Sequence, residues 1–528
     1  MPVEDGETFR MGEQATLLGQ TIEAFRIEGE LEPRLPKMEA AKRVKAIDRS
    51  QSFWGAIDIE KLIEEDHAAR GIWAMVNRLD LSRLEKKIKA VEGHAGQSPL
   101  DPRLLMALWI YAYSEGVSSA RELSRMCEYE PGCQWLAGMR SVNYHTLADF
   151  RVDHKDELDE IFVQVLGLLS GEGIIEMKRI AHDGTKIKAQ AASHSFRREQ
   201  CIGEHLELAR QQVEALNNPE SEELSQRALQ ARKRASREKK QRLEEALRAL
   251  EELQKARPAS ERDQARVSET DPEARVMKQA DGGFAPSYNV QISTDAANGI
   301  IVGVDVTQAG NDCDQLVNAV DRVEANTGRT PEQVLVDGGY TMKNSNIEAM
   351  AERGIDLNGP VVENNSEASL KQRGIQPDFY PDRFRYDETT DTLICPADKT
   401  LKRRQTRQCE GRIEYTYRAS ATDCLQCPFR DQCCPKASPR LVVRKQDSPA
   451  VAAFKAKMQS EEAKQLYRSR AQIAEFPNAW IKDKLGLRQF RLRGRQKVRA
   501  EAVWACLTYN IQQWLRLNWR RSLGVAVA

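Results

Sequence analysis

The chain has 528 residues, 41% of them hydrophobic and 30% charged, so it is too long for one ordinary domain and apolar enough to bury a core. Lys and Arg together number 79, as do Asp and Glu, and this zero net charge excludes a uniformly basic nucleic-acid-binding protein. No apolar run approaches the roughly 18 residues that span a bilayer. The N-terminus, MPVEDGETFRMGEQ, is acidic where a signal peptide is basic and then apolar. These features predict a cytoplasmic protein without a membrane partner.

The first third of the chain is predicted to be an arm followed by a helical region. Residues 1–56 show little periodicity and are interpreted as an N-terminal arm. Residues 57–170 carry apolar side chains at helical spacing, such as Ile59 and Leu62, and glycine stops such as Gly116. Short helices joined by tight turns are typical of a helix-turn-helix DNA-binding domain, and equally of a small helical bundle. Both interpretations stay open at this point.

Strand patterns begin after Gly171 and predict a multidomain α/β protein with a ribonuclease-H-like core. The segment IIEMKRIAHDGTKIKA alternates, and strand signals return in YNVQISTD, IIVGVDVTQ, QVLVDGGY and DLNGPVV. Helical patterns separate the later strands. Three strands, a helix, a strand, a helix, a strand and a late helix form the element order of a ribonuclease-H-like fold. We place this core at residues 171–520 and a tail at 521–528.

Two insertions interrupt the predicted core. Residues 190–275 are dense in Glu, Arg, Lys, Gln and Ala. Four leucines within them share one helix face, which predicts a helical hairpin or short coiled coil: Leu243, Leu247, Leu250 and Leu253. Residues 363–460 are basic, contain cysteines and show no regular periodicity, so we expect an irregular insertion there.

Two aspartates are candidate ligands because of where their strands place them. Alternation sets Asp183 on one face of its strand with Ala181 and Thr185. Asp337 ends the strand VLV and precedes a glycine pair, at the sheet edge where open α/β sheets bind ligands. Either aspartate alone is more often a turn former. Two of them at matching positions in the fold favour a shared ligand role.

The third carboxylate is expected on the late helix, and Glu475 is our choice. Lys482 lies two turns further along the same face and Arg468 two turns back, an arrangement that suits a metal site acting on a phosphodiester. The alternative is a solvated surface helix. Pro477 is expected to kink this helix near the glutamate. Weaker candidates for the same role are Glu461, Glu462 and Glu501.

The cysteines form a second constellation. Cys424 and Cys427 have C-x2-C spacing, Cys395 lies upstream, and Cys433 and Cys434 follow. Cys395, Cys424, Cys427 and one of the later pair could close a tetrahedral structural zinc site, with free thiols as the alternative. Other cysteines look isolated, with no ligand role expected: Cys127, Cys133, Cys201, Cys313 and Cys506.

Local basic patches can supply the DNA affinity that the net charge does not. The segment 482–499 holds eight Lys or Arg against one Asp, including Arg491, Arg493 and Arg495, and the segment 399–407 is a second patch. Contacts from such residues to phosphates position DNA without reading its sequence.

Motifs in the same order occur in a known family. They are SPLDPRLLMALWIYAYSEGVSSARELSRM, NYHTLADFR, HDGTKIKA, DPEARVMK with YNVQISTD, VLVDGGY, and a late segment ending in RLRGRQKVRAEAVWACLTYNI. Together they resemble insertion-sequence DDE transposases, most closely insertion-sequence family eleven-eighty-two. The resemblance extends in order from residue 57 to residue 515.

This resemblance implies a function and a set of site residues. It implies a bacterial, nucleoid-associated enzyme whose catalytic triad is Asp183, Asp337 and Glu475, binding two Mg²⁺ or Mn²⁺ ions. Such an enzyme cleaves DNA and joins the freed 3′-hydroxyl ends to target DNA. Its partners are double-stranded DNA, as element terminal repeats and as target, and a second copy of the chain on that DNA. By analogy, the helical region reads the element ends. The accompanying signature residues are Tyr467, Arg470 and Lys482.

One departure from the broader family pattern concerns the late helix. There the arginine lies four residues before the glutamate, whereas position 471 is Ala here and Arg470 lies five residues before Glu475. Tyr467 is likewise eight residues before the glutamate in place of seven. Two rival functions stay open. One is a ribonuclease-H-like nuclease without strand transfer, and the other is a catalytically dead DNA-binding regulator.

Overall fold

The computed structural model describes residues 56–88, 98–217, 225–362, 366–436 and 439–524, and two short strands before them. The chain divides into two compact units, Met1–Ile57 and Asp58–Ala528. In the first, β1 (Thr16–Leu17) and β2 (Gln20–Thr21) form an antiparallel pair. Most of the predicted arm and the last four residues of the predicted tail lie outside the described residues. No helix in the described part of the chain is long and apolar enough to cross a membrane.

The second unit begins with short helices that share a core with the C-terminal helix. Side-chain caps start several of them, because Asp101 accepts the N–H of Arg103 and Ser119 that of Glu122. The buried Tyr113 ring stacks on that of Trp504, with centroids 6.3 Å apart. The helices are α1 (Ala68–Val76), α2 (Ser82–Glu85), α3 (Pro102–Ser114), α4 (Ala120–Tyr129), α5 (Pro131–Ala137), α6 (Tyr144–Asp153), α7 (Lys155–Gly171) and α19 (Arg495–Trp514).

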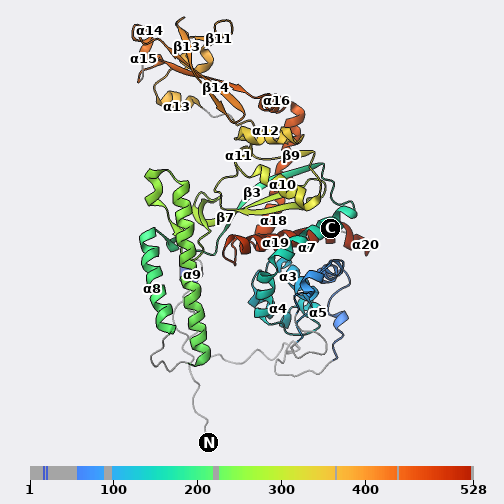
Figure 1. The fold of residues 1–528 in the computed structure, drawn as a ribbon. Coiled ribbons are helices and arrows are strands. Elements are labelled where there is room, and N and C mark those ends of the chain that lie inside the picture. The colour runs from blue at the N-terminus through green and yellow to red at the C-terminus, as the bar shows by residue number, and fades with distance from the viewer. Residues whose placement is uncertain are drawn as a thin grey trace, which may run out of the picture. The chain divides into compact units, whose positions relative to one another are not determined.

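A six-stranded mixed sheet forms the centre of this unit (Figure 1). Its order is β10-β9-β3-β7, and both β6 and β8 pair with β7. β3, β9 and β10 are mutually parallel, whereas β7 is antiparallel to β3, β6 and β8. The strands are β3 (Arg179–Lys188), β6 (Arg275–Lys278), β7 (Phe284–Asp295), β8 (Ile301–Thr307), β9 (Gln333–Leu335) and β10 (Asp356–Asn358).

Helices cover both faces of this sheet. The α10 helix (Leu316–Thr327) and α19 pack on β8, while α18 (Arg470–Asp483) packs on β3 and β7. α11 (Gly338–Thr341) and α12 (Asn344–Glu352) connect β9 to β10. The sequence predicts one helix from Glu461 to the first glycine break, but α17 (Glu461–Arg468) ends before Ser469 and α18 starts after it. Arg468 therefore lies on a different helix from Glu475.

The segment between β3 and β6 contains a pair of packed helices, α8 (Glu199–Asn217) and α9 (Gln226–Ala256), which lie side by side in Figure 1. Leu243 and Leu250 of the leucine face are buried between them, and Leu247 and Leu253 are partly buried. Two-residue strands, β4 (Phe196–Arg197) and β5 (Val267–Ser268), pair where the chain enters and leaves this segment.

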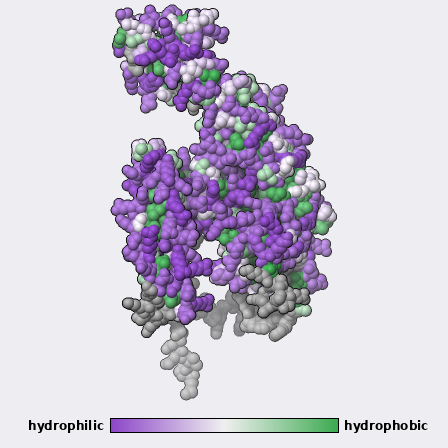
Figure 2. All heavy atoms as spheres, in the orientation of Figure 1, coloured by the Kyte–Doolittle hydropathy of each residue, from purple (hydrophilic) through white to green (hydrophobic). Residues whose placement is uncertain are grey.

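The cysteine-containing segment is not irregular, contrary to the expectation from its sequence. It forms a five-stranded antiparallel sheet with its own small core around Leu401 and Tyr417. Charged side chains hide the strand pattern, since residues 402–408 of β13 are all exposed; Figure 2 shows mainly hydrophilic residues on the visible face of this sheet. The strands are β11 (Arg385–Asp387), β12 (Thr392–Ile394), β13 (Thr400–Cys409), β14 (Arg412–Ala419) and β15 (Leu441–Asp447), followed by α16 (Pro449–Lys457).

Candidate active site

Two aspartates lie at or beyond neighbouring parallel strands. Asp183 is in β3, and Asp337 lies two residues after the end of β9, where it caps α11 and its Oδ1 accepts a hydrogen bond of 2.9 Å from the Gly339 N–H. The strands are in register at Ala181 and Leu335. The pairing ends there, and Asp337 lies two residues beyond it, close enough for its charge to raise the pKa of Asp183. Alternation places Asp183 on the face of the sheet that carries Ala181.

Helix α18 covers that face and brings Glu475 to it. Ala474 of this helix packs against Ala181 and Leu335. Glu475 is the next residue, and its side chain is 65% exposed, so it stands at the rim of the contact. The helix runs on through Pro477 without interruption. The three carboxylates selected from the sequence therefore lie in one region at the edge of the sheet, but within the described residues their oxygens are not all within 4.8 Å of one another.

A single guanidinium joins two of these carboxylates. Nη2 of Arg470 lies 3.1 Å from Oδ1 of Asp183, and Nη1 lies 4.0 Å from Oε1 of Glu475. Asp183 also accepts hydrogen bonds from the Gly184 N–H at 3.0 Å and from the amide of Asn478 at 3.4 Å. Arg470 is only 12% exposed, so this contact is shielded from solvent. Its position five residues before the glutamate thus still places it in the site.

Burial raises the pKa of Asp183 to about 6. The negative charges of Asp337 and Asp312 raise it further, whereas Arg470 and the Gly184 N–H oppose the shift. A buried carboxylate beside other carboxylates is electrostatically unfavourable without a cation. Perturbed groups of this kind are concentrated at functional sites.

The fourth carboxylate, Asp312, was not predicted. It lies between β8 and α10, and its Oδ1 accepts hydrogen bonds from the side chains of Asn289 at 2.6 Å and Gln291 at 2.7 Å. A Cβ atom at Gly184 would lie 2.3 Å from this oxygen, so an alanine there would require the Asp312 side chain to shift. The glycine directly after Asp183 in a strand was the signal that could have indicated such a neighbour.

His182, the other neighbour of Asp183, belongs to a buried network behind the sheet. Its ring nitrogens lie 2.8 Å from the Ser293 hydroxyl and 2.9 Å from Oε1 of Gln291. The Tyr340 hydroxyl donates to the same Gln291 oxygen at 2.7 Å. Burial lowers the pKa of His182 to about 4, so the ring is neutral near pH 7. Both nitrogens are occupied, which leaves the histidine a supporting role.

Tyr467 lies next to the same carboxylates. It is on α17, it is partly buried against the main core, and burial raises the pKa of its hydroxyl. The charge of Arg470 opposes this shift, and those of Asp337 and Asp183 add to it. The two signature residues therefore approach the site from α17 and from the start of α18.

Lys482 opens the site onto a basic groove. Burial lowers the pKa of its ammonium group, and the charge of Asp183 acts in the opposite direction. Lys482, Gly184 and Asp312 line a groove of about 650 Å³. Its other cationic lining residues are Lys186, Lys188, Lys278 and Arg488.

The alternative glutamates have other partners. Glu501 is fully buried, and its carboxylate accepts the N–H groups of Arg491 and Leu492 at 3.0–3.1 Å. It therefore holds the loop before α19 in place. Glu461 pairs with Lys464 at 2.8 Å on the exposed side of α17, and Glu462 is exposed beside it.

Of the other predicted DNA-binding arginines, Arg493 lines a second groove. Arg493 donates to the carbonyl of Gln190 at 3.2 Å, and with Lys497 it lines a groove of about 530 Å³ alongside α9. The N–H of Arg495 donates to Glu273 at 2.8 Å, and Glu273 also lines this groove. The structure thus places Arg493 along a groove that α9 borders, whereas the backbone N–H of Arg491 donates to Glu501.

The predicted zinc ligands converge on one small pocket. Two of the sulfur atoms accept backbone hydrogen bonds. The N–H of Lys399 donates to Sγ of Cys395 at 3.3 Å, and the N–H of Arg440 donates to Sγ of Cys424 at 3.4 Å. Within the described residues, however, no three of these sulfurs lie within 4.8 Å of one another. The donor set suits zinc, but the sulfurs are more widely spread than in a closed site. The pocket is lined by Cys395, Cys424, Cys427, Cys433 and Cys434.

Two family models match the chain. The Transposase DDE domain matches residues 394–515, which include Glu475 and Lys482 but neither aspartate. The Transposase domain (DUF772) matches residues 57–153, which hold α1 to α6. No curated protein matches this chain. Over these two stretches the chain is similar to transposases.

Proposed function

We propose that this protein binds the ends of its mobile element, cleaves DNA there, and joins the 3′-hydroxyl ends to target DNA. The observation that carries the proposal is the placement of Arg470 between Asp183 and Glu475, with Asp337 close enough for its charge to raise the pKa of Asp183. The strand order β8-β7-β3-β9-β10 supports a ribonuclease-H-like core, since three antiparallel strands are followed by two parallel ones. On this basis we place the catalytic domain at residues 171–520, with insertions at 190–275 and 363–460.

The donor set fits hard divalent cations. Three carboxylates offer only oxygen, which Mg²⁺ and Mn²⁺ prefer. Two such ions, when bound, supply activation of the attacking oxygen and stabilisation of the leaving oxygen during in-line phosphodiester transfer. Asp183 and Asp337 would hold them from the sheet, and Glu475 from the exposed rim of α18. The raised pKa of Asp183 is consistent with a carboxylate whose full ionisation depends on a bound cation.

Basic residues of this chain would position the DNA. Lys482 lies at the mouth of the groove that reaches Gly184, so its ammonium group can contact a phosphate next to the carboxylates. Arg470 neutralises Asp183 and Glu475 without DNA and can turn to a phosphate when cations replace it. Sites further away are the exposed face of β13 and the groove lined by Arg493. The helical region 57–170 would recognise the element ends, and a homodimer would hold the two ends together.

The cysteine pocket is proposed as a structural zinc site for the five-stranded sheet. Its small core of about ten buried residues gives limited hydrophobic stabilisation, and a bound metal ion adds folding free energy directly. Burial raises the pKa of Cys433 to about 12, which disfavours its thiolate unless a cation is present. Elemental analysis of protein purified without added metal should give one zinc per chain fewer for Cys424→Ser than for the wild type. A metal-free and fully folded preparation would contradict this assignment.

The experiment for the whole proposal uses the full chain with a DNA fragment carrying its element ends, Mg²⁺ and a target plasmid. We expect joined products from the wild type. Asp183→Asn should bind the ends with nearly unchanged affinity and give no cleavage, because it keeps the shape of the side chain and removes its charge. If the wild type cleaves DNA without joining it, the protein is a nuclease; if it binds DNA without cleaving it, the protein is a DNA-binding regulator. Mg²⁺-dependent nicking by Asp183→Asn would exclude this residue as a metal ligand.

A further inference from the structure

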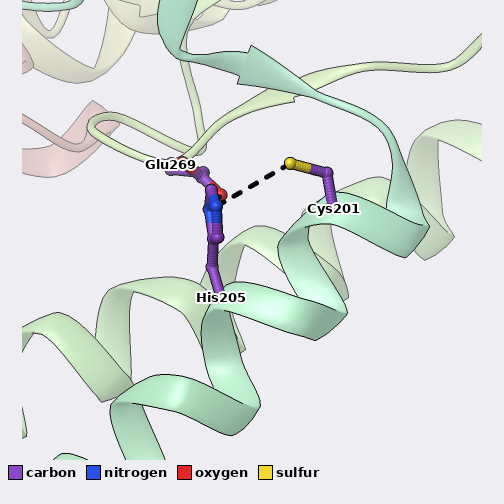
Figure 3. Close-up of side chains that lie close together, drawn as sticks. All are labelled: Cys201, His205 and Glu269. Carbon is purple, nitrogen blue, oxygen red and sulfur yellow. Dashed lines mark hydrogen bonds and ion pairs between the residues drawn. The ribbon is translucent and has the colours of Figure 1, made fainter.

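A second cluster of potential metal ligands lies at the base of the helix pair (Figure 3). Cys201 and His205 are four residues apart in the first turns of α8, so their side chains leave the same face of the helix. Glu269 follows β5, where the chain leaves the helical segment. Pairing of Phe196 with Ser268 in β4 and β5 brings the two ends of the segment together. The sequence alone left Cys201 looking isolated, and the structure corrects this.

The three side chains point toward one another. Sγ of Cys201 lies 4.0 Å from Nε2 of His205, and Nδ1 of His205 lies 2.5 Å from Oε1 of Glu269. One sulfur, one imidazole nitrogen and one carboxylate oxygen all lie within 4.8 Å of one another. In the described part of the chain this is the one group of three such donors at this spacing.

We propose that Cys201, His205 and Glu269 bind one Zn²⁺ ion. Thiolate, imidazole and carboxylate are the three protein ligands of zinc, and three of them with a water complete four-coordination. The His205 side chain is 40% exposed and that of Glu269 is 20% exposed, so an ion and its water can enter and both side chains can rotate slightly. The ion binds the thiolate of Cys201, whose proton passes to solvent, and this makes metal binding weaker at low pH.

Such an ion would fix the entry and exit of the helix pair to each other. His205 and Glu269 are 64 residues apart in the sequence, and the two-residue pairing of β4 with β5 closes the same loop. A cross-link between distant residues stabilises a fold by restricting the unfolded chain. The site shares no residue with the proposed catalytic carboxylates or with the cysteine pocket, so the inference stands independently of both.

Alkylation of Cys201 tests the proposal in the unmodified protein. The full chain is stripped of metal, treated with iodoacetamide with and without Zn²⁺, and analysed by peptide mass spectrometry. We expect Zn²⁺ to slow alkylation of Cys201 about tenfold or more, because a coordinated thiolate is not available as a nucleophile. Cys409, a half-buried cysteine outside both clusters, is the internal control and should react at an unchanged rate. An unchanged rate at Cys201 would overturn the proposal.

Co²⁺ titration gives a second measurement, since cobalt bound to thiolate has a sulfur-to-metal charge-transfer band. Cys201→Ser should lose one equivalent of this absorption, whereas the control Cys409→Ser keeps it. Glu269→Gln should weaken metal binding at least 10- to 100-fold, because the loss of even an outer-sphere partner of a metal site has an effect of this size. Equal stoichiometry in Cys201→Ser and wild type would contradict the site. The alkylation rate in wild type decides the question if a variant does not fold.

Discussion

The guanidinium of Arg470 lies 3.1 Å from the carboxylate of Asp183, where α18 crosses the strand that carries the aspartate. The same group reaches within 4.0 Å of Glu475, so one cation of the chain serves two carboxylates. A divalent ion entering between them must displace this guanidinium or share the site with it. On the proposed function, Arg470 would leave these carboxylates when a divalent ion binds them.

Replacing this arginine should therefore strengthen cation binding while weakening DNA cleavage. Arg470→Gln removes a positive charge that competes with the ion, and we expect Mn²⁺ to bind roughly tenfold more tightly at pH 8. Calorimetric titration of wild type and variant measures the change. Weaker Mn²⁺ binding in the variant would mean that Arg470 helps to build the metal site.

Adding one methyl group at Gly184, where Asp312 approaches β3, should lower the stability of the protein. Gly184→Ala puts a Cβ atom 2.3 Å from Oδ1 of Asp312 and 2.5 Å from Nε2 of Gln291, and we expect a loss of about 1–3 kcal/mol in the free energy of unfolding. Urea denaturation measures it. Gly203→Ala, in open space on α8, is the matched control and should be neutral or stabilising. Equal stability of both variants would show that Asp312 does not lie against Gly184.

The pKa of Asp183 makes the stability of the site dependent on pH. The pKa of Asp183 is raised to about 6 in the folded state, so folding favours its protonated form. Its contribution to the free energy of unfolding is therefore fully present below the unfolded pKa of roughly 4 and is lost as pH rises through 6. A cation reverses this loss above pH 6. We expect Mn²⁺ to raise the unfolding temperature at pH 7 and to have little effect at pH 5. The Mn²⁺ effect should vanish in Asp183→Asn, and a pH-independent effect would argue against this carboxylate.

Two glutamates of the C-terminal helices should behave in opposite ways. Glu501→Gln alters a fully buried carboxylate that accepts two backbone N–H groups, and we expect a loss of about 1–3 kcal/mol in stability. Glu475→Gln changes a side chain that is 65% exposed and should alter stability by less than about 0.5 kcal/mol. Thermal unfolding of both variants checks this contrast. A large destabilisation by Glu475→Gln would indicate a structural role for that residue.

Local patterns in the sequence are enough to indicate several of these features. Period-two alternation and the following glycines point to Asp183 and Asp337, because each signal depends on a few adjacent residues. The leucine face of α9 is equally local, and the structure buries Leu243 and Leu250 as that pattern predicts.

Contacts between distant segments could not be predicted in this way. Asp312 reaches Gln291 across two strands, and Glu269 reaches His205 through a pairing of only two residues on each side. β13 was missed because its outward residues are charged and its stability comes from pairing with β12 and β14, not from an apolar face. Side chains that act through tertiary neighbours leave no periodic signal.

DNA cleavage by two glutamine variants tests the central claim most directly. Glu475→Gln and Glu462→Gln are incubated with element-end DNA and Mg²⁺ beside the wild type, and cut strands are separated by electrophoresis. The account predicts that Glu475→Gln binds the ends but does not cut them, because the site at Asp183 and Asp337 has lost its third carboxylate. Glu462→Gln, exposed on α17, should cut like the wild type. Normal cutting by Glu475→Gln would contradict the assignment of the active site.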